Sequence, residues 1–206
     1  RSYSVTGVQT CALPIWEEPQ YIFYTEGSAD RSFSAADLPS PLPSEVRCIL
    51  FGSISMTMEP VASTIEALVL RESARADAAA PVISLDPNVR PVMIRDRDAY
   101  RTRLEKWFAA ATIVKISGAD MDFVYPGLGR EAALEKILAM GPTMVVTTLG
   151  PDGALALGRR ADGSRFSATA PVVPVKVADT IGAGDTFHAA FLSYLELNGK
   201  MSRAAL

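Results

Sequence analysis

Short apolar runs alternate with amphipathic stretches along most of the chain. Five runs rich in β-branched and aromatic residues predict strands, several too continuously apolar to have a face in water: 21–25, 47–51, 82–85, 112–116 and 144–148. Three stretches between them predict helices, at 60–72, 98–110 and 130–140. This alternation predicts an α/β fold whose mostly parallel sheet is flanked by helices in three αβα layers.

One more helix is predicted from about Gly184 to Asn198, because apolar residues recur there every three or four positions. Gly182 and Gly184 lie at its start, where unpaired backbone N–H groups and the helix dipole favour an anion such as a phosphate. Asp185 is unexpected, because a phosphate repels a carboxylate. It has a role if it accepts the proton of an attacking hydroxyl. The simpler interpretation of a lone Gly-x-Gly is a turn whose acid caps the helix.

The surrounding residues favour an anion-binding helix start with Asp185 as a base over a simple capped turn. The run from Asp179 to Asp185, followed by Thr-Phe-His-Ala-Ala-Phe, resembles the signature of the ribokinase-like (PfkB) carbohydrate kinases in its fructokinase form. A dinucleotide fingerprint would need a third glycine at Phe187, and no Gly-x4-Gly-Lys-Ser/Thr occurs. The resemblance implies that Asp185 is the catalytic base and that its neighbours hold the transferred phosphoryl group. These neighbours are Gly182, Ala183 and Gly184, with Thr180 on the nucleotide side.

Two upstream segments resemble the same family in its order. Residues 84–91 read Ser-Leu-Asp-Pro-Asn-Val-Arg-Pro, which implies that Asn88 and Arg90 bind the substrate; a plain exit from strand to loop is as consistent with the residues. Next, Lys115 and Ser117 end a strand and are implied to serve the nucleotide. The family often has Asn-x-x-Glu for magnesium where this chain has Ser117-x-x-Asp120, so Asp120 is the implied metal residue. An N-cap serine with a first-turn acid is the physical alternative.

A third segment runs from a strand through Gly-Pro-Asp-Gly into a second strand, a hairpin-like pattern. The segment resembles the family's Thr-x-Gly-x-x-Gly, which implies that Thr148, Gly150 and Gly153 lie near ATP. Because ligands bind beyond the carboxyl ends of parallel strands, all these segments are predicted to meet at one edge of the sheet. Residues 23–31 and 52–55 also resemble fructokinase segments, which favours fructose over ribose or adenosine.

Composition agrees with small-molecule chemistry. The 206 residues are 49% hydrophobic and 21% charged with net charge −3, so there is no basic surface for nucleic acid or anionic lipid. No 18-residue apolar run could span a membrane. Cys11 and Cys48 form no disulfide framework, and we expect a cytoplasmic protein. The single histidine, His188, is interpreted as a packing or polar-surface residue, since a zinc or Ser-His-Asp site would rest on it alone.

The first 16 residues resemble the translation of a sequencing adapter. We expect them to be a non-native or disordered tail that is not part of the fold. A natural leader or a short edge strand is the alternative. Residues 17–206 are then a partial kinase domain, incomplete at both ends. A complete member of the family would carry sugar-binding segments before Tyr21 and the adenine pocket after Leu206.

The sequence therefore predicts an ATP-dependent sugar kinase that needs Mg²⁺ and could use a monovalent cation such as K⁺. D-fructose, giving fructose 6-phosphate, is the favoured substrate. A 2-keto-3-deoxygluconate kinase, a ribokinase-type activity and a non-catalytic nucleotide-binding fragment stay open, and this fragment itself could be inactive. The expected partners are a sugar and ATP, with neither nucleic acid nor membrane, and a homodimer is possible for the full-length parent.

Overall fold

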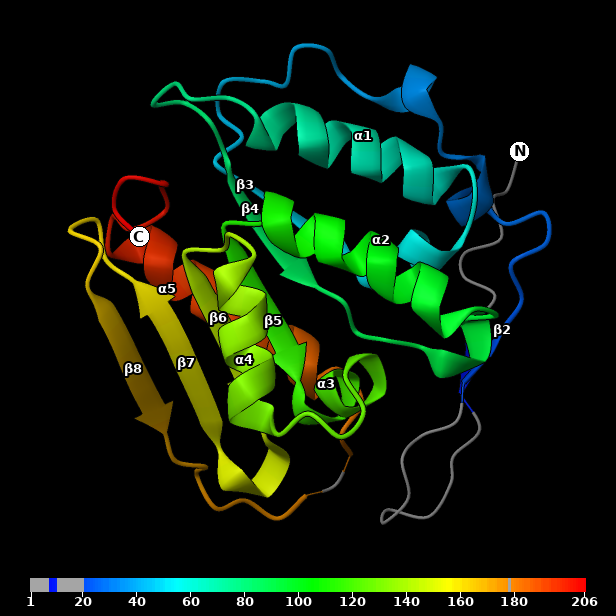
Figure 1. The fold of residues 1–206 in the computed structure, drawn as a ribbon. Helices are drawn as coiled ribbons and strands as arrows, with labels where there is room; N and C mark the ends of the chain where they lie inside the picture. The colour runs from blue at the N-terminus through cyan, green and yellow to red at the C-terminus, as the bar shows by residue number, and fades with distance from the viewer. Residues whose placement is uncertain (1–7, 11–20, 178) are drawn as a thin grey trace.

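The computed structural model describes residues 8–10, 21–177 and 179–206, and a six-stranded sheet lies at its centre (Figure 1). The strands follow one another in sheet order as β3 Cys48–Gly52, β4 Val82–Asp86, β5 Ile113–Ser117, β6 Met144–Thr148, β7 Ala154–Arg159 and β8 Arg165–Ala170. Pairing is parallel from β3 to β6 and antiparallel from β6 to β8. The predicted mostly parallel α/β sheet is confirmed.

Helices cover both faces of this sheet. Figure 1 shows three of them in front of it: α1 Val61–Ser73, α2 Arg97–Ala110 and α4 Arg130–Ala139. The long C-terminal helix α5, Ala183–Leu197, crosses behind it, and the short α3, Gly118–Val124, follows β5 directly. The three layers of an αβα fold are therefore present. No helix in the described part of the chain is long and apolar enough to cross a membrane.

The larger core lies between the sheet and the front helices. On α2 the side chains of Leu104, Trp107 and Phe108 are fully buried and pack against β4, β5 and their neighbours. This is the stripe that a 3.6-residue period produces on one helix face. Because β4 and β5 are covered on both sides, their alternating residues face two different cores: Ile83 and Leu85 face the front, whereas Val82 packs behind with Ile113 and Leu195.

Most predicted boundaries agree with the structure within a few residues, and β6 agrees residue for residue. Two elements were not predicted. β8 carries mostly exposed side chains, so it has no apolar pattern to reveal it. α3 is only one to two turns long, and the sequence indicates it only through the alternative of Ser117 as an N-cap. In the part of the chain that the structure describes, five short 3-10 helices complete the fold: Ala29–Ser32, Ala35–Asp37, Ser53–Thr57, Pro91–Met93 and Gly150–Asp152.

A separate two-stranded sheet lies at the start of the chain. β1, Val8–Thr10, pairs antiparallel with β2, Tyr21–Phe23. Residues 8–10 thus form a short strand, which is one of the alternatives to a non-native tail. The rest of the proposed non-native tail, residues 1–7 and 11–16, lies outside the described residues.

Candidate functional site

The segments singled out in the sequence lie at the carboxyl edge of the sheet. The parallel register pairs Gly52 with Asp86 and Ser117 with Thr148, which are the last residues of β3, β4, β5 and β6. Strand ends in parallel register bring the loops that follow them to the same side. The segments that carry Asn88, Asp120 and Gly150 therefore begin side by side, although they are about 30 residues apart in the sequence.

The N-terminal turn of α5 has the geometry of an anion-binding helix start. Gly182 is the N-cap and has a left-handed backbone with φ of 75°, which glycine adopts without strain. Thr180 O accepts the amide of Ala183 at 3.2 Å, and Gly182 O accepts that of Thr186 at 2.8 Å. Among the described residues, none accepts a hydrogen bond from the amides of Gly184 and Asp185. These two N–H groups are available to a ligand.

Asp185 lies in the first turn of this helix and is exposed, so its carboxylate is accessible to a substrate. Upstream, the Asp179 carboxylate accepts the amide of Ile181 at 2.8 Å and thereby holds the turn before the helix. The two aspartates at the ends of the motif thus have different positions. Asp179 shapes the loop, whereas Asp185 remains open to chemistry.

The loop after β4 is fixed by its own side chains. Asp86 Oδ1 accepts the amide of Asn88 at 3.2 Å, and Asn88 has a positive φ of 38°. The guanidinium of Arg90 donates to Asn88 Oδ1 at 2.6 Å and to the carbonyls of Asn88 and Val89, both at 3.2 Å. Asn88 and Arg90 are thus held together in one compact turn beside the sheet edge.

Gly52 brings the neighbouring loop against this one. A Cβ at Gly52 would lie 1.7 Å from Asp86 O, and φ at Gly52 is 144°, so a side chain has no room there. The next residue, Ser53, donates its amide to Pro87 O at 3.1 Å. The glycine of Gly-Ser-Ile-Ser is therefore required for the close approach of the loops after β3 and β4.

Ser117 and Asp120 form a capping box at the start of α3. Ser117 Oγ accepts the amide of Asp120 at 3.0 Å, and Asp120 Oδ2 accepts that of Ser117 at 3.4 Å. The other oxygen, Oδ1, accepts the amide of Val89 at 2.9 Å, which ties this helix to the loop after β4. Burial raises the pKa of the Asp120 carboxyl, and the nearby Asp86 adds to this, while the hydrogen bonds from Ser117 and Val89 oppose it.

The described residues do not supply a protein cage for a metal ion. Among them, no three His, Cys, Asp or Glu side chains gather closely enough to hold one. Both Asp120 oxygens already accept backbone amides. Mg²⁺ is commonly held by one or two carboxylates together with substrate phosphates and water, and a lone buried carboxylate fits only that mode.

The hairpin between β6 and β7 has the predicted tight turn. Gly150 and Gly153 both have positive φ, 57° and 85°, and Leu149 N donates to Gly153 O at 2.8 Å. A Cβ at Gly153 would lie 2.1 Å from Ala170 O on the next strand. Thr148, the last residue of β6, is only half-buried, so it and the turn line the open edge of the sheet.

A buried polar cluster lies behind the α5 turn, and the sequence did not reveal it. Lys115 Nζ donates to Asp86 Oδ2 at 2.8 Å, and both side chains are buried. His188 Nε2 lies 2.7 Å from Ser84 Oγ, and its Nδ1 lies 3.8 Å from Asp86 Oδ2. Burial alone would raise the pKa of Asp86, but His188 and Lys115 together lower it below its ordinary value. His188 is fully buried, so its interpretation as a packing residue is confirmed and the alternative of a polar-surface position is wrong.

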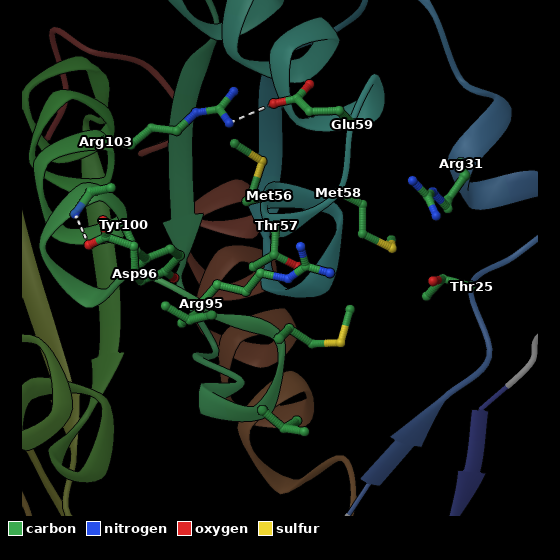
Figure 2. Close-up of a pocket in the computed structure, with 14 residues that line it drawn as sticks. Thr25, Arg31, Met56, Thr57, Met58, Glu59, Arg95, Asp96, Tyr100 and Arg103 are labelled. Carbon is green, nitrogen blue, oxygen red and sulfur yellow. Dashed lines mark hydrogen bonds and ion pairs between the residues drawn. The ribbon is translucent and has the colours of Figure 1, made fainter.

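A cleft of about 610 Å³ opens beside these loops (Figure 2). Its walls come from the segment after β2, the loops after β3 and β4, and the start of α2. Figure 2 shows Thr25 and Arg31 on one side and Tyr100 and Arg103 on the other, with Met56 and Met58 between them. None of the predicted catalytic, nucleotide, substrate or metal residues lines this cleft, but Thr25 and Arg31 belong to the segment 23–31 that resembles fructokinases. It lies next to the candidate site along the chain, since Val92–Asp96 follow directly after Arg90 and Pro91.

The fold and this edge together define a class: an α/β protein that presents a helix N-terminus and an exposed carboxylate beyond the ends of its parallel strands. Comparison with known proteins identifies the family. The model of the pfkB family of carbohydrate kinases matches residues 15–206. The chain belongs to this family.

The most similar relatives include fructokinases from bacteria and plants. A fructokinase of Rhizobium leguminosarum bv. trifolii is 38% identical over 183 residues, which cover 89% of this chain and 53% of that protein. Fructokinase-1 of Oryza sativa subsp. japonica is 31% identical, covering 85% of this chain and 52% of that protein. The chain therefore spans about half the length of these relatives.

Solved structures give the same result. A fructokinase from Vibrio cholerae O395, bound to fructose, ADP and a calcium ion, superposes with a TM-score of 0.71 at 26% identity, covering 85% of this chain and 53% of that one. The aminoimidazole riboside kinase of Salmonella enterica, complexed with aminoimidazole riboside and an ATP analogue, gives 0.70 at 25% identity, covering 90% and 61%. The predicted ribokinase-like fold is confirmed.

Proposed function

We propose that the full-length protein carrying this domain is an ATP-dependent kinase that phosphorylates a sugar hydroxyl, with D-fructose as its substrate and fructose 6-phosphate as its product. The observation that carries the proposal is the first turn of α5, where two amides that donate to no described residue adjoin the exposed carboxylate of Asp185. The curated relatives named fructokinase support fructose as the sugar. The cleft of Figure 2 adjoins this edge and offers a side from which a sugar could approach.

In this reaction Asp185 accepts the proton of the sugar hydroxyl. The hydroxyl oxygen forms a bond to the γ-phosphorus as the bond from that phosphorus to the bridging oxygen breaks, and ADP leaves with the electron pair. Negative charge spreads over the transferred oxygens, where the amides of Gly184 and Asp185 could donate to it. The charge of Asp185 is tolerated at a phosphate-binding turn because it takes up a proton as the bond forms.

The remaining predicted contacts belong to this proposal as well. Thr148, Gly150 and Gly153 would face the nucleotide from the β6–β7 turn, with Thr180 and Ser117 nearby, and Asn88 and Arg90 would face the sugar. Asp120 would act on magnesium through water. The ion would screen the phosphates, and a monovalent cation, cytoplasmic location and a homodimer also remain proposals.

The test compares Asp185→Ala with Asp98→Ala in the full-length protein, using a coupled ATP assay. Asp98 is a matched control because it is an aspartate in the first turn of another helix, α2, with a side chain 80% exposed. We expect Asp185→Ala to lower kcat by roughly 100-fold or more and to leave ADP affinity unchanged. Asp98→Ala should retain activity. Unchanged turnover in Asp185→Ala would exclude it as the base.

The same assay separates the rival substrates. It is run with fructose, ribose, 2-keto-3-deoxygluconate and adenosine at equal concentrations. Fructose should give the highest kcat/KM. A preference for 2-keto-3-deoxygluconate would move the assignment within the family, since the Asp86-Pro-Asn88-x-Arg90 segment also resembles kinases of that sugar acid. Nucleotide binding with no turnover on any of the four would leave a non-catalytic binding module.

A further inference from the structure

Four polar side chains are buried together between β4, β5 and α5. They are Ser84, Asp86, Lys115 and His188, each less than one tenth exposed. They pair completely: Lys115 Nζ donates to Asp86 Oδ2 at 2.8 Å, and His188 Nε2 lies 2.7 Å from Ser84 Oγ. A buried ion pair of this kind contributes little to stability compared with apolar residues of the same volume. Its presence at this place in the fold therefore calls for another reason.

The ammonium of Lys115 lies directly behind the first turn of α5. A Cβ built on Gly184 would be 3.0 Å from Lys115 Nζ, and among the described residues outside its own helix and chain neighbours no other atom would come within 4 Å of it. Asp86 is thus farther from the turn than Lys115. The ion pair consequently presents its positive end to the helix N-terminus and its negative end away from it.

The same cluster holds α5 at two successive turns on one face. Gly184 rests on Lys115, and His188, four residues later, rests on Ser84 and Asp86. Both contacts are made to side chains on the back of the sheet: Ser84 and Lys115 lie in the middle of β4 and β5, and Asp86 is the last residue of β4. The position of the amides of Gly184 and Asp185 relative to the sheet edge is therefore set by this cluster.

We propose that Lys115 is a positioning residue for the transferred phosphoryl group and not a direct nucleotide ligand. Its buried ammonium, oriented by Asp86 and kept close by the absence of a side chain at Gly184, adds positive potential to the anion-binding turn. Charge acts over longer range in a buried site than in water. The inference rests on the proposed kinase function and specifies how one of its predicted nucleotide residues acts.

The proposal makes a specific prediction about nucleotides. The first turn of α5 would contact the terminal phosphate of ATP, which ADP lacks. Loss of the Lys115 charge should therefore weaken the binding of a non-hydrolysable ATP analogue and leave the binding of ADP unaffected. A purely structural ion pair would affect both nucleotides alike, because both need the same fold.

The experiment uses the double variant Asp86→Asn/Lys115→Met in the full-length protein. Removing both charges leaves no unpaired buried ion, and the net charge is unchanged. Affinities for ADP and for the ATP analogue are measured by calorimetry, with thermal unfolding as a check of folding. We expect the analogue to bind about 10-fold more weakly, with ADP changed by less than about twofold. Equal losses for both nucleotides, or none, would overturn the proposal.

Gly184→Ala supplies a second, independent measurement. The added methyl group would press on Lys115 Nζ, so the substitution should weaken binding of the ATP analogue when it is made in the wild-type protein. In the double variant, where the ammonium is absent, the additional loss should be at least about threefold smaller. Losses that simply multiply would show that Gly184 and Lys115 do not act together. If wild-type protein binds neither nucleotide, the kinase proposal itself fails, which is a different result from either of these.

Discussion

The two faces of the central sheet are built differently. In front, α1, α2 and α4 enclose one large apolar core that includes Trp107 and Phe108 (Figure 1). Behind, only α5 covers the described strands, and its apolar cluster is small: Val82, Ile113, Leu195 and Met201. Toward the carboxyl edge this rear face changes from apolar to charged at Asp86 and Lys115. The front face carries the stability of the fold, whereas the rear face positions the helix turn of the candidate site.

The front face should be the more costly to damage. Phe108→Ala removes a fully buried ring and should lower the free energy of unfolding by about 3–5 kcal/mol. Phe191→Ala is the matched control on α5, where the ring is only half-buried, and should cost less than about 2 kcal/mol. Urea unfolding followed by circular dichroism measures both. Equal losses would contradict the division between the faces.

On the rear face the largest expected effect comes from the ion pair. Asp86→Asn leaves Lys115 buried without a counter-charge and should destabilise the protein by about 3 kcal/mol at pH 7. The folded-state pKa of Asp86 is lowered, so its stabilising contribution is present above the unfolded pKa of about 3.9 and is lost as pH falls through the folded value.

The difference between wild type and Asp86→Asn should therefore be largest near neutral pH and shrink below about pH 4. Urea unfolding between pH 3 and pH 7 measures it. Asp98→Asn, an exposed aspartate, serves as the control and should track the wild type throughout. A difference that does not change with pH would show that the Asp86 charge is not what stabilises the cluster.

The front face was also the more predictable from sequence. Its strands are apolar runs and α2 has a clear 3.6-residue stripe, so burial follows from local pattern. The α5 turn was recognised from its glycines and Asp185. The Asp86–Lys115 pair was not, because the register that places β4 beside β5 is a property of the sheet and not of either segment. A lysine inside the apolar run of β5 was the one signal present.

Ser117 and Asp120 also show that contacts between distant segments cannot be predicted from local sequence. Ser117 and Asp120 fit a capping box as well as a metal motif, and the structure contains the capping box. The second hydrogen bond of Asp120, to Val89, joins segments 31 residues apart and could not be read locally. Short-range patterns therefore predicted the elements, while contacts between elements determined how the candidate residues are held.

A smaller effect on stability is expected at the carboxyl edge of the sheet, where the loops after β3 and β4 contact each other. Gly52→Ala would place a methyl group against Asp86 O at a positive φ, and should cost about 2 kcal/mol or more. Gly27→Ala is the matched control: φ is also positive, 68°, but apart from its chain neighbours no atom of the described residues lies within 4 Å of the added Cβ. It should cost about 1 kcal/mol. Equal costs in thermal unfolding would mean that the clash with Asp86 is relieved by a shift of the loop.

The smallest effect is expected on the outer side of α5. Leu197 is 86% exposed, so Leu197→Ala should change the free energy of unfolding of this chain by less than about 0.5 kcal/mol. Leu195→Ala, two residues away on the buried side, should cost about 2 kcal/mol. The pair shares helix, residue type and substitution, and differs in burial.

The reactivity of Cys48 can compare the buried and exposed sides of α5 without denaturant. It packs in the rear cluster with Leu195, and burial, with Glu196 adding to it, raises the pKa of its thiol to about 11. Cys48 is half-buried, so labelling by a thiol reagent at pH 8, followed by mass spectrometry of the Cys48 peptide, should be slow while α5 stays on the sheet and faster when α5 moves away. Leu195→Ala should accelerate labelling, because it weakens the contact that holds α5 on the sheet, whereas Leu197→Ala should not. Acceleration by both variants would show that the outer side of α5 also contributes to its attachment.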